Sequence, residues 1–258
     1  MNTYDALRSL STRGTSRAGL GSLLFAALLL GSAGCGGDDS GQADSREKRT
    51  VGGTAEGTVE APKEGAALAE SGARAAETRT YTNGREALIP KLAENFVPFS
   101  FEYPATWKVL ERGDQPDDVN FVKVERGTPD GFTSENFAVG YVSLPPGTER
   151  NPAVLKQLLD TFEAQFSTGF PNYRRVSDDR TTVGGREATG FRFAAHAENT
   201  PRGPVDLWGR ILVLPGDDGR GVVLMMIGSP VESVLRGPED VGEKGDLPTI
   251  LRSFRMGR

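Results

Sequence analysis

The sequence predicts a single α+β domain in which a mostly antiparallel sheet packs against one central and one C-terminal helix. Two observations predict this class. Short apolar runs recur between turn-forming residues, which is typical of strands joined by hairpins. One long segment, 152–168, instead places apolar residues at the three- and four-residue spacing of a helix. Several strands interrupted by one helix favour an antiparallel sheet with helices packed on it.

Six segments have the composition of β-strands. The first alternates aromatic and polar residues and ends at Pro104, because proline cannot continue a central strand. Gly184-Gly185 and the segment 215–219 are typical of hairpin turns, since both are rich in residues that tolerate positive φ. The predicted strands are 99–103, 120–124, 137–142, 188–197, 207–214 and 222–227.

The central helix is predicted over 152–168. Asn151 provides an N-cap side chain, and Pro152 suits the first helical turn. Gly169 and Pro171 favour an end to the helix just beyond. The apolar stripe consists of Leu155, Leu158, Leu159, Phe162 and Phe166.

A second, shorter helix is expected to run from Asp246 or Leu247 to Phe254. Ile250, Leu251 and Phe254 fall on one side of such a helix. We expect this side to pack on the sheet.

The first 35 residues divide into the three zones of a secretory signal. Residues 1–17 carry three arginines and one aspartate, residues 23–30 are all apolar, and small residues then lead to Cys35, the only cysteine. The apolar run is shorter than the about 20 residues that a membrane-spanning helix needs. We therefore predict a cleavable signal peptide over 1–34 rather than a transmembrane anchor.

Residues 28–35 resemble the lipobox of bacterial lipoproteins, in which a cysteine follows small residues directly after the apolar run. Ser32 departs from the leucine that is usual at its position. The resemblance implies cleavage between Gly34 and Cys35 and acylation of Cys35 with diacylglycerol and palmitate. Several acyl chains would hold the protein on a membrane without a spanning helix. The alternative is an ordinary secretory signal with an incidental cysteine.

The same resemblance implies a location in the bacterial cell envelope. Gly36, rather than aspartate, follows the cysteine. In a host with two membranes this implies the outer membrane, with the protein facing the periplasm. In a host with one membrane it implies the outer face of the cell membrane.

Residues 35–79 are predicted to be a lipidated cysteine and a disordered linker. The segment from Gly36 to Arg79 has no aromatic residue, so it cannot bury enough apolar area to offset its ordering entropy. A flexible coil of this length spans about 35–40 Å. Docking of the linker on a partner is the alternative. The composition changes at Thr80, and 80–258 is predicted to be the folded domain.

Residues 99–107 read F-S-F-E-Y-P-A-T-W and resemble the F-x-x-x-Y-P-x-x-W signature of the PsbP family, which includes DcrB-like and mycobacterial Lpq-type lipoproteins. Residues 183–188 and 250–254 resemble the hairpin and the closing helix of that family. The resemblance covers most of 95–254. It implies a PsbP-like α/β/α sandwich in which these residues are structural and Trp107 caps the core. It does not transfer the photosynthetic role of PsbP, because the lipobox and linker fit an envelope lipoprotein better.

Composition argues against several classes of function. The net charge is −5, and from Thr80 onward 21 Lys and Arg face 25 Asp and Glu, so we expect no binding to nucleic acid. A single cysteine excludes an internal disulfide, and the single histidine, His196, leaves little room for a histidine metal site. The acidic pairs at 117–118, 178–179 and 217–218 are expected to be turn formers, since none has the spacing of an EF-hand loop.

The chain also lacks a serine nucleophile elbow, a phosphate loop and a dinucleotide fingerprint. We therefore expect no catalytic residues, no cofactor and no metal. The interpretation favoured is a non-catalytic envelope lipoprotein, attached to the membrane through acylated Cys35, whose domain binds or scaffolds another macromolecule. A protein partner is the expected one.

Two alternatives stay open. The domain could carry or sense a small apolar ligand in a groove between helix 152–168 and the sheet, near Phe166, Phe170 and Tyr173. It could also be an enzyme whose site is assembled from distant residues. An apolar pocket beneath the helix would favour the carrier, whereas a filled core with an exposed apolar patch would favour the binding module.

Overall fold

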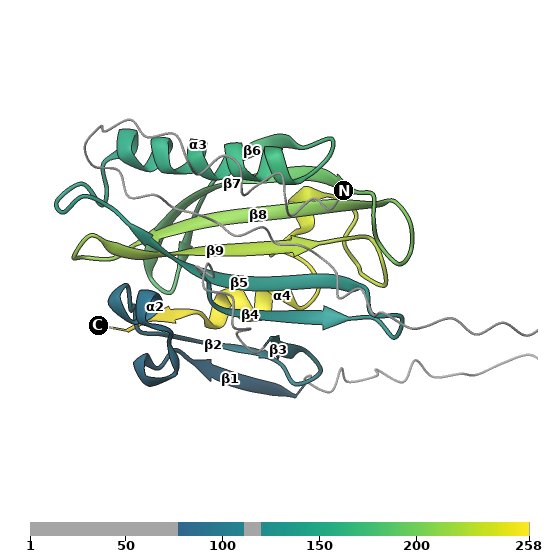
Figure 1. The fold of residues 1–258 in the computed structure, drawn as a ribbon, viewed down its shortest axis with the longest axis horizontal. Coiled ribbons are helices and arrows are strands. Elements are labelled where there is room, and N and C mark those ends of the chain that lie inside the picture. Colours follow the sequence, from purple (N-terminus) through teal and green to yellow (C-terminus); the bar gives the residue numbers. More distant parts are fainter. Residues whose placement is uncertain (1–76, 111–119, 258) are drawn as a thin grey trace, which may run out of the picture. The chain divides into compact units, whose positions relative to one another are not determined.

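Figure 1 shows a computed structural model of the protein, which describes residues 77–110 and 120–257. The predicted signal peptide, Cys35 and most of the predicted linker lie outside these residues. The first described strand, β1 (Thr78–Thr82), begins just before the predicted start of the domain at Thr80.

Seven strands form a large, fully antiparallel sheet. In spatial order these strands are β3 (Lys108–Leu110), β4 (Asn120–Gly127), β5 (Thr133–Ser143), β9 (Arg220–Gly228), β8 (Val205–Pro215), β7 (Arg186–Ala197) and β6 (Arg174–Val183). Strands β6 to β9 form a meander that returns to pair with β5. The predicted hairpin turns are confirmed: Gly184 and Gly185 join β6 to β7 with φ of 58° and 80°. The α+β class is confirmed.

Three strands form a second, smaller sheet in the order β1-β2-β10. Its centre is β2 (Phe99–Pro104), and its other edge is β10 (Arg255–Met256). The aromatic residues of β2, Phe99, Phe101 and Tyr103, are all buried. Alternation in the sequence predicts which face of β2 is buried, but it does not predict which strands are its neighbours. The division into two sheets is therefore visible only in the structure.

Helix α3 (Pro152–Gly169) covers one face of the large sheet. Its N-terminus is capped as predicted, since the Asn151 Oδ1 accepts a hydrogen bond of 3.0 Å from the backbone N–H of Ala153. The buried residues of the helix are Leu158, Leu159, Phe162 and Phe166, which are four of the five predicted in its stripe.

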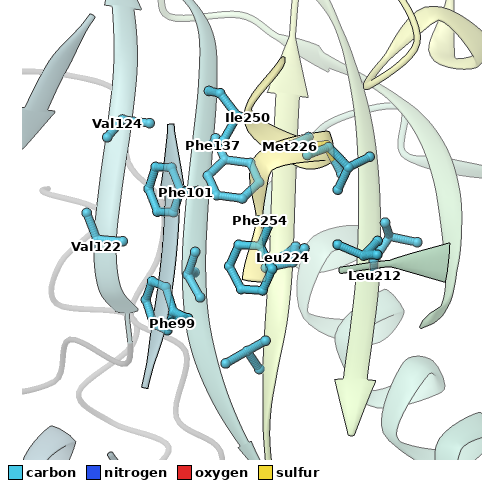
Figure 2. Packing of buried hydrophobic residues seen from close by; sticks show 14 of the residues in the cluster. Phe99, Phe101, Val122, Val124, Phe137, Leu212, Leu224, Met226, Ile250 and Phe254 are labelled. Atoms are coloured by element: carbon cyan, nitrogen blue, oxygen red, sulfur yellow. The ribbon is translucent and has the colours of Figure 1, made fainter. Parts of the chain in front are cut away.

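The opposite face of the large sheet is covered by the small sheet and by α4 (Leu247–Ser253). Figure 2 shows Phe99 and Phe101 of β2 beside Phe137 of β5, with Ile250 and Phe254 completing the layer. Helix α4 ends one residue before the predicted Phe254, which caps it and is fully buried.

Trp107 is buried in this second core, as the PsbP resemblance implied. Its indole Nε1 donates a hydrogen bond of 3.3 Å to Oδ2 of Asp246, at the start of α4. The remaining short elements are α2 (Pro90–Glu94) and the 3₁₀ turns η1 (Arg85–Ala87) and η2 (Pro238–Asp240). Within 77–110 and 120–257, no helix has both the length and the apolar character needed to cross a bilayer.

Candidate functional site

Of the residues singled out from the sequence, Gly34 and Cys35 lie outside the described residues. His196 lies on β7, directly opposite Asp206 on β8. Its Nδ1 is 3.0 Å from the Asp206 Oδ1, and both side chains are partly exposed. The pair is a cross-strand contact between two side chains on the surface of the sheet.

The interface between α3 and the large sheet is filled by side chains. The rings of Phe166, Phe170 and Tyr173 lie with their centroids 5.2, 6.3 and 5.3 Å from that of Phe193 on β7. These are the aromatic residues that the carrier hypothesis needed for a ligand groove. Since they pack against the sheet, their arrangement favours a filled core over an apolar ligand site.

Two of the three acidic pairs lie in the described part of the chain. Asp217 and Asp218 occupy the turn between β8 and β9, as predicted. Arg186 donates to both carboxylate oxygens of Asp217, and Arg220 pairs with Asp218. These contacts hold the pKa values of both carboxyl groups below their usual range.

The turn prediction for Asp178 and Asp179 is wrong, because both residues lie inside β6. Alternation along the strand sends them to opposite faces. Asp178 accepts a hydrogen bond of 2.6 Å from Arg175, whereas Asp179 lies on the buried side. Strand β6 was missed because it forms an edge of the sheet and carries few apolar residues.

Asp179 belongs to a group of four charges, here called the ionic cluster, of which three are largely buried and Glu243 is exposed: Asp179, Arg192, Arg210 and Glu243. The Arg210 side chain is only 3% exposed. Its Nε donates to Asp179 over 2.6 Å and its Nη1 to Glu243 over 2.9 Å. Arg192 and Arg210 face each other on β7 and β8, so the two carboxylates offset a repulsion between like charges.

Arg192 also holds the segment around η2 against the sheet. Its Nη1 donates to the carbonyl oxygens of Pro238, Glu239 and Val241 over 2.9, 3.1 and 2.8 Å. Burial lowers the pKa of the Arg192 guanidinium, and the nearby charge of Arg210 lowers it further. The ionic cluster therefore joins β6, β7, β8 and the η2 segment through charge-assisted hydrogen bonds.

A hollow of about 570 Å³ lies beside the ionic cluster. We call it the arginine hollow. Its lining comes from the β6–β7 hairpin, from β8, from the segment after η2 and from α4 and β10. The lining residues are Thr181, Thr182, Gly184, Gly185, Arg210, Gly242, Glu243, Leu251, Arg252 and Arg255.

The arginine hollow is cationic in an acidic domain, because three arginines and one glutamate line it. Within 77–110 and 120–257, the guanidinium of Arg252 has no carboxylate and no hydrogen-bond acceptor within reach. The Nη1 of Arg255 donates to the carbonyl oxygens of Arg252 and Phe254 over 2.6 and 2.7 Å. Arg255 is thus oriented by the backbone, and no carboxylate among the described residues neutralises its charge.

Two glycines shape the walls of the hollow. Gly184 has a φ of 58°, and a Cβ there would lie 2.7 Å from the carbonyl oxygen of Phe254. Gly242 has a φ of 76°, and a Cβ there would lie 2.9 Å from Nη1 of Arg210. Both positions therefore need glycine for backbone conformation and for space.

A second hollow, of about 500 Å³, lies between the loop before α3 and the β8–β9 turn. Its only arginine, Arg150, is 3.8 Å from Asp217 and is largely exposed. This hollow is a gap between surface loops with a paired charge. In the described part of the chain, no three His, Cys, Asp or Glu side chains come together as metal ligands.

Glu135, near the start of β5, carries a further buried charge. Glu135 is 1% exposed, and its Oε1 accepts from Arg126 over 3.2 Å and from the Ser233 hydroxyl over 2.8 Å. Burial raises the pKa of Glu135, and the nearby Asp246 adds to the rise, while Ser233 and Arg126 oppose it. Arg126 also donates to the carbonyl oxygen of Glu232, so these contacts fix the segment that follows β9.

No family model and no curated protein matches the sequence. The fold is similar to that of several solved structures. The PsbP of the cyanobacterium Synechocystis sp. (CyanoP) has 12% identity and a TM-score of 0.42, covering 72% of this chain and 96% of that one. LpqN of Mycobacterium tuberculosis, involved in cell envelope biogenesis, has 10% identity and a TM-score of 0.41, covering 70% and 92%.

The Ran-binding protein Mog1p of Saccharomyces cerevisiae has 13% identity and a TM-score of 0.40, covering 70% of this chain and 95% of that one. At identities this low, the likeness concerns the fold and not the function.

Proposed function

We propose that this protein is a non-catalytic lipoprotein of the bacterial cell envelope, anchored in a membrane through acylated Cys35, whose domain binds another macromolecule. The proposal has two parts, the anchor and the binding domain. They are supported by different observations and are tested separately.

The anchor is supported by the sequence alone. A basic segment, an apolar run and small residues precede the only cysteine of the chain, and a segment without aromatic residues follows it. In this proposal residues 1–34 are removed, Cys35 becomes the acylated first residue, and residues 36–79 link the membrane to the domain. The domain itself then needs no apolar surface for membrane attachment.

The arginine hollow is the observation that carries the binding part of the proposal. Arg175, Arg186, Arg202 and Arg220 of the domain each pair with at least one carboxylate. Arg252 has no such partner among the described residues, although the domain is rich in carboxylates. Cations left unpaired around a concave surface attract an anionic partner.

The chemistry of the lining supports binding rather than catalysis. The side chains in the hollow are threonine, arginine, glutamate and leucine. The carboxylate of Glu243 accepts hydrogen bonds from Arg192 and Arg210, so it is already engaged within the domain. Guanidinium groups arranged in this way bind and orient anions.

Membrane fractionation tests the anchor. The Cys35→Ser variant should move from the membrane fraction to the soluble fraction, because no acyl chain can be attached. The matched control is Ser32→Leu, which restores the usual lipobox residue and should leave the protein in the membrane fraction. Unchanged fractionation of Cys35→Ser would refute the lipid anchor.

Affinity capture from membranes, after crosslinking of the full lipidated chain, tests the binding part. We expect the same partner protein in repeated captures from independent cultures. A lipid or small metabolite that co-purifies in stoichiometric amount without a protein partner would contradict the proposal and favour the carrier hypothesis.

A further inference from the structure

We infer that the arginine hollow binds carboxylates of an acidic protein segment, with Arg252 and Arg255 as the residues that contact the anion. This inference rests on the proposed function, in which the domain binds a macromolecule. It adds the place of binding, the residues involved and the chemistry of the partner.

The four arginines near the hollow divide into two pairs with different tasks. Arg192 and Arg210 are bonded to Asp179, to Glu243 and to backbone carbonyls, so they form a fixed wall. Arg252 and Arg255 keep their donors available. Only Nη1 of Arg255 is bonded within the described part of the chain, which leaves its Nε and Nη2 for a ligand.

The geometry of these donors suits a carboxylate. A guanidinium presents parallel N–H groups that match the two oxygens of a carboxylate or phosphate. Arg252 lies on α4 and Arg255 on β10, three residues apart, and both border the same hollow. Thr181 of β6 also borders the hollow, on the same face of the strand as Asp179, and its hydroxyl can donate a further hydrogen bond to the bound anion.

The neighbouring strand favours a protein segment as the source of the anion. Thr181 and Thr182 belong to β6, which ends the large sheet and, among the described strands, pairs with β7 alone. An extended peptide can add to such an edge through main-chain hydrogen bonds. A carboxylate of that peptide then reaches the hollow at the end of the edge.

The charges along β6 point to the same partner. Arg174 and Arg180 have no carboxylate partner in the described residues. Asp178 is exposed, but Arg175 pairs with it. The edge and the hollow together therefore present four cations that an acidic segment would neutralise: Arg174, Arg180, Arg252 and Arg255.

Fluorescence anisotropy with a labelled hexaglutamate peptide tests the inference, using the purified full chain in detergent at low salt. The Arg252→Ala/Arg255→Ala variant should weaken binding by about tenfold or more, because it removes the charge-assisted hydrogen bonds to the peptide. The matched control is Arg79→Ala/Lys108→Ala, which removes the same charge from β1 and β3, away from β6, and should retain wild-type affinity.

Two further variants separate binding from folding and from simple charge. Arg252→Ala alone removes a guanidinium without a partner in the described residues, so it should leave the thermal unfolding temperature unchanged and still weaken binding several-fold. The Arg252→Lys/Arg255→Lys variant keeps the charge and loses the paired donors, so its affinity should fall between wild type and the double alanine variant.

Absence of peptide binding by the wild-type protein, or equal affinity in the double alanine variant and the control, would overturn the inference. Two other results would also overturn the inference if they depend on both arginines. One is displacement of the peptide by inorganic phosphate, and the other is binding of the protein to phosphatidylglycerol vesicles in place of the peptide. Those results would assign the hollow to phosphate groups.

Crosslinking capture from membranes distinguishes this inference from the proposed function. A partner captured equally by wild type and by Arg252→Ala/Arg255→Ala would refute the role of the hollow and leave the binding function standing. Peptide binding that depends on both arginines, with no protein partner captured, would refute the proposed function and support the anion site alone. Loss of the partner in this variant, but not in the control, would support both.

Discussion

Replacing Arg210 by methionine removes the guanidinium at the centre of the ionic cluster while keeping a long, flexible side chain. Arg210 is 3% exposed and makes short contacts of 2.6 Å to Asp179 and 2.9 Å to Glu243. Among the described residues, Asp179 would retain only the longer contact of 3.4 Å to Arg192, so the variant leaves a buried carboxylate whose charge is weakly compensated.

Breaking a buried ion pair by removing one partner costs about 3–5 kcal/mol. We expect the lower part of this range, about 3 kcal/mol, because Arg192 stays near both carboxylates and Glu243 is partly exposed. A loss of this size lowers the unfolding temperature of a domain of this length by about 6–12 °C.

Urea unfolding, followed by the fluorescence of Trp107 and Trp208, measures the loss of free energy. The double variant Arg210→Met/Asp179→Asn should lose less than the sum of the two single variants, by about 1 kcal/mol or more, because the residues interact directly. Additive losses, or a loss below about 1 kcal/mol in Arg210→Met, would refute the assigned role of the cluster.

Three other predictions concern packing, pH and capping. Gly209→Val should destabilise the domain by more than about 2 kcal/mol in urea unfolding, because a Cβ at Gly209 would lie 2.0 Å from the Phe193 ring. The control variant Gly127→Ala should have little effect, since a Cβ at Gly127 meets no atom within 4 Å. Burial raises the pKa of Glu135, so ionisation of this carboxyl group opposes folding. The free energy of unfolding of the wild type should therefore fall relative to that of Glu135→Gln as the pH rises through that pKa. A difference between the two proteins that stays constant between pH 4 and 8 would contradict this. Asn151→Ala should cost about 1 kcal/mol and reduce the thermal stability of the domain, while Asn151→Asp, which can still cap the helix, should not.

The sequence was sufficient to predict the elements that are determined by interactions between residues close together in the chain. The spacing from Leu155 to Phe166 and the cap at Asn151 predicted α3, and Gly184-Gly185 predicted the β6–β7 turn. These features depend on backbone preferences and on periodicity within one element, which a single sequence displays directly.

The arginine hollow could not be predicted in the same way. Its lining comes from residues between Thr181 and Arg255, on five different segments, and no spacing in the sequence brings them together. Asp179 looked like a turn residue because its strand lies at an edge and lacks apolar alternation. Its partner Arg210 gave no sign in the sequence of being buried.

The position of β2 between β1 and β10 has a consequence for folding. The two neighbours of β2 come from opposite ends of the domain, and the Glu102 N–H, for example, bonds to the Ser253 hydroxyl 151 positions away. Phe99 and Phe101 also stack on Phe254, at 5.5 and 6.3 Å. Contacts between such distant segments form late, because the entropy cost of closing a long loop comes before any stabilising contact is made.

A partly folded chain in which β10 has not yet docked therefore exposes one backbone edge of β2 together with two phenylalanine rings. Such an unpaired aromatic edge is a site at which two unfinished chains can pair with each other. The small sheet thus makes the domain vulnerable to aggregation until its most distant segments have met, and the docking of α4 and β10 ends that exposure.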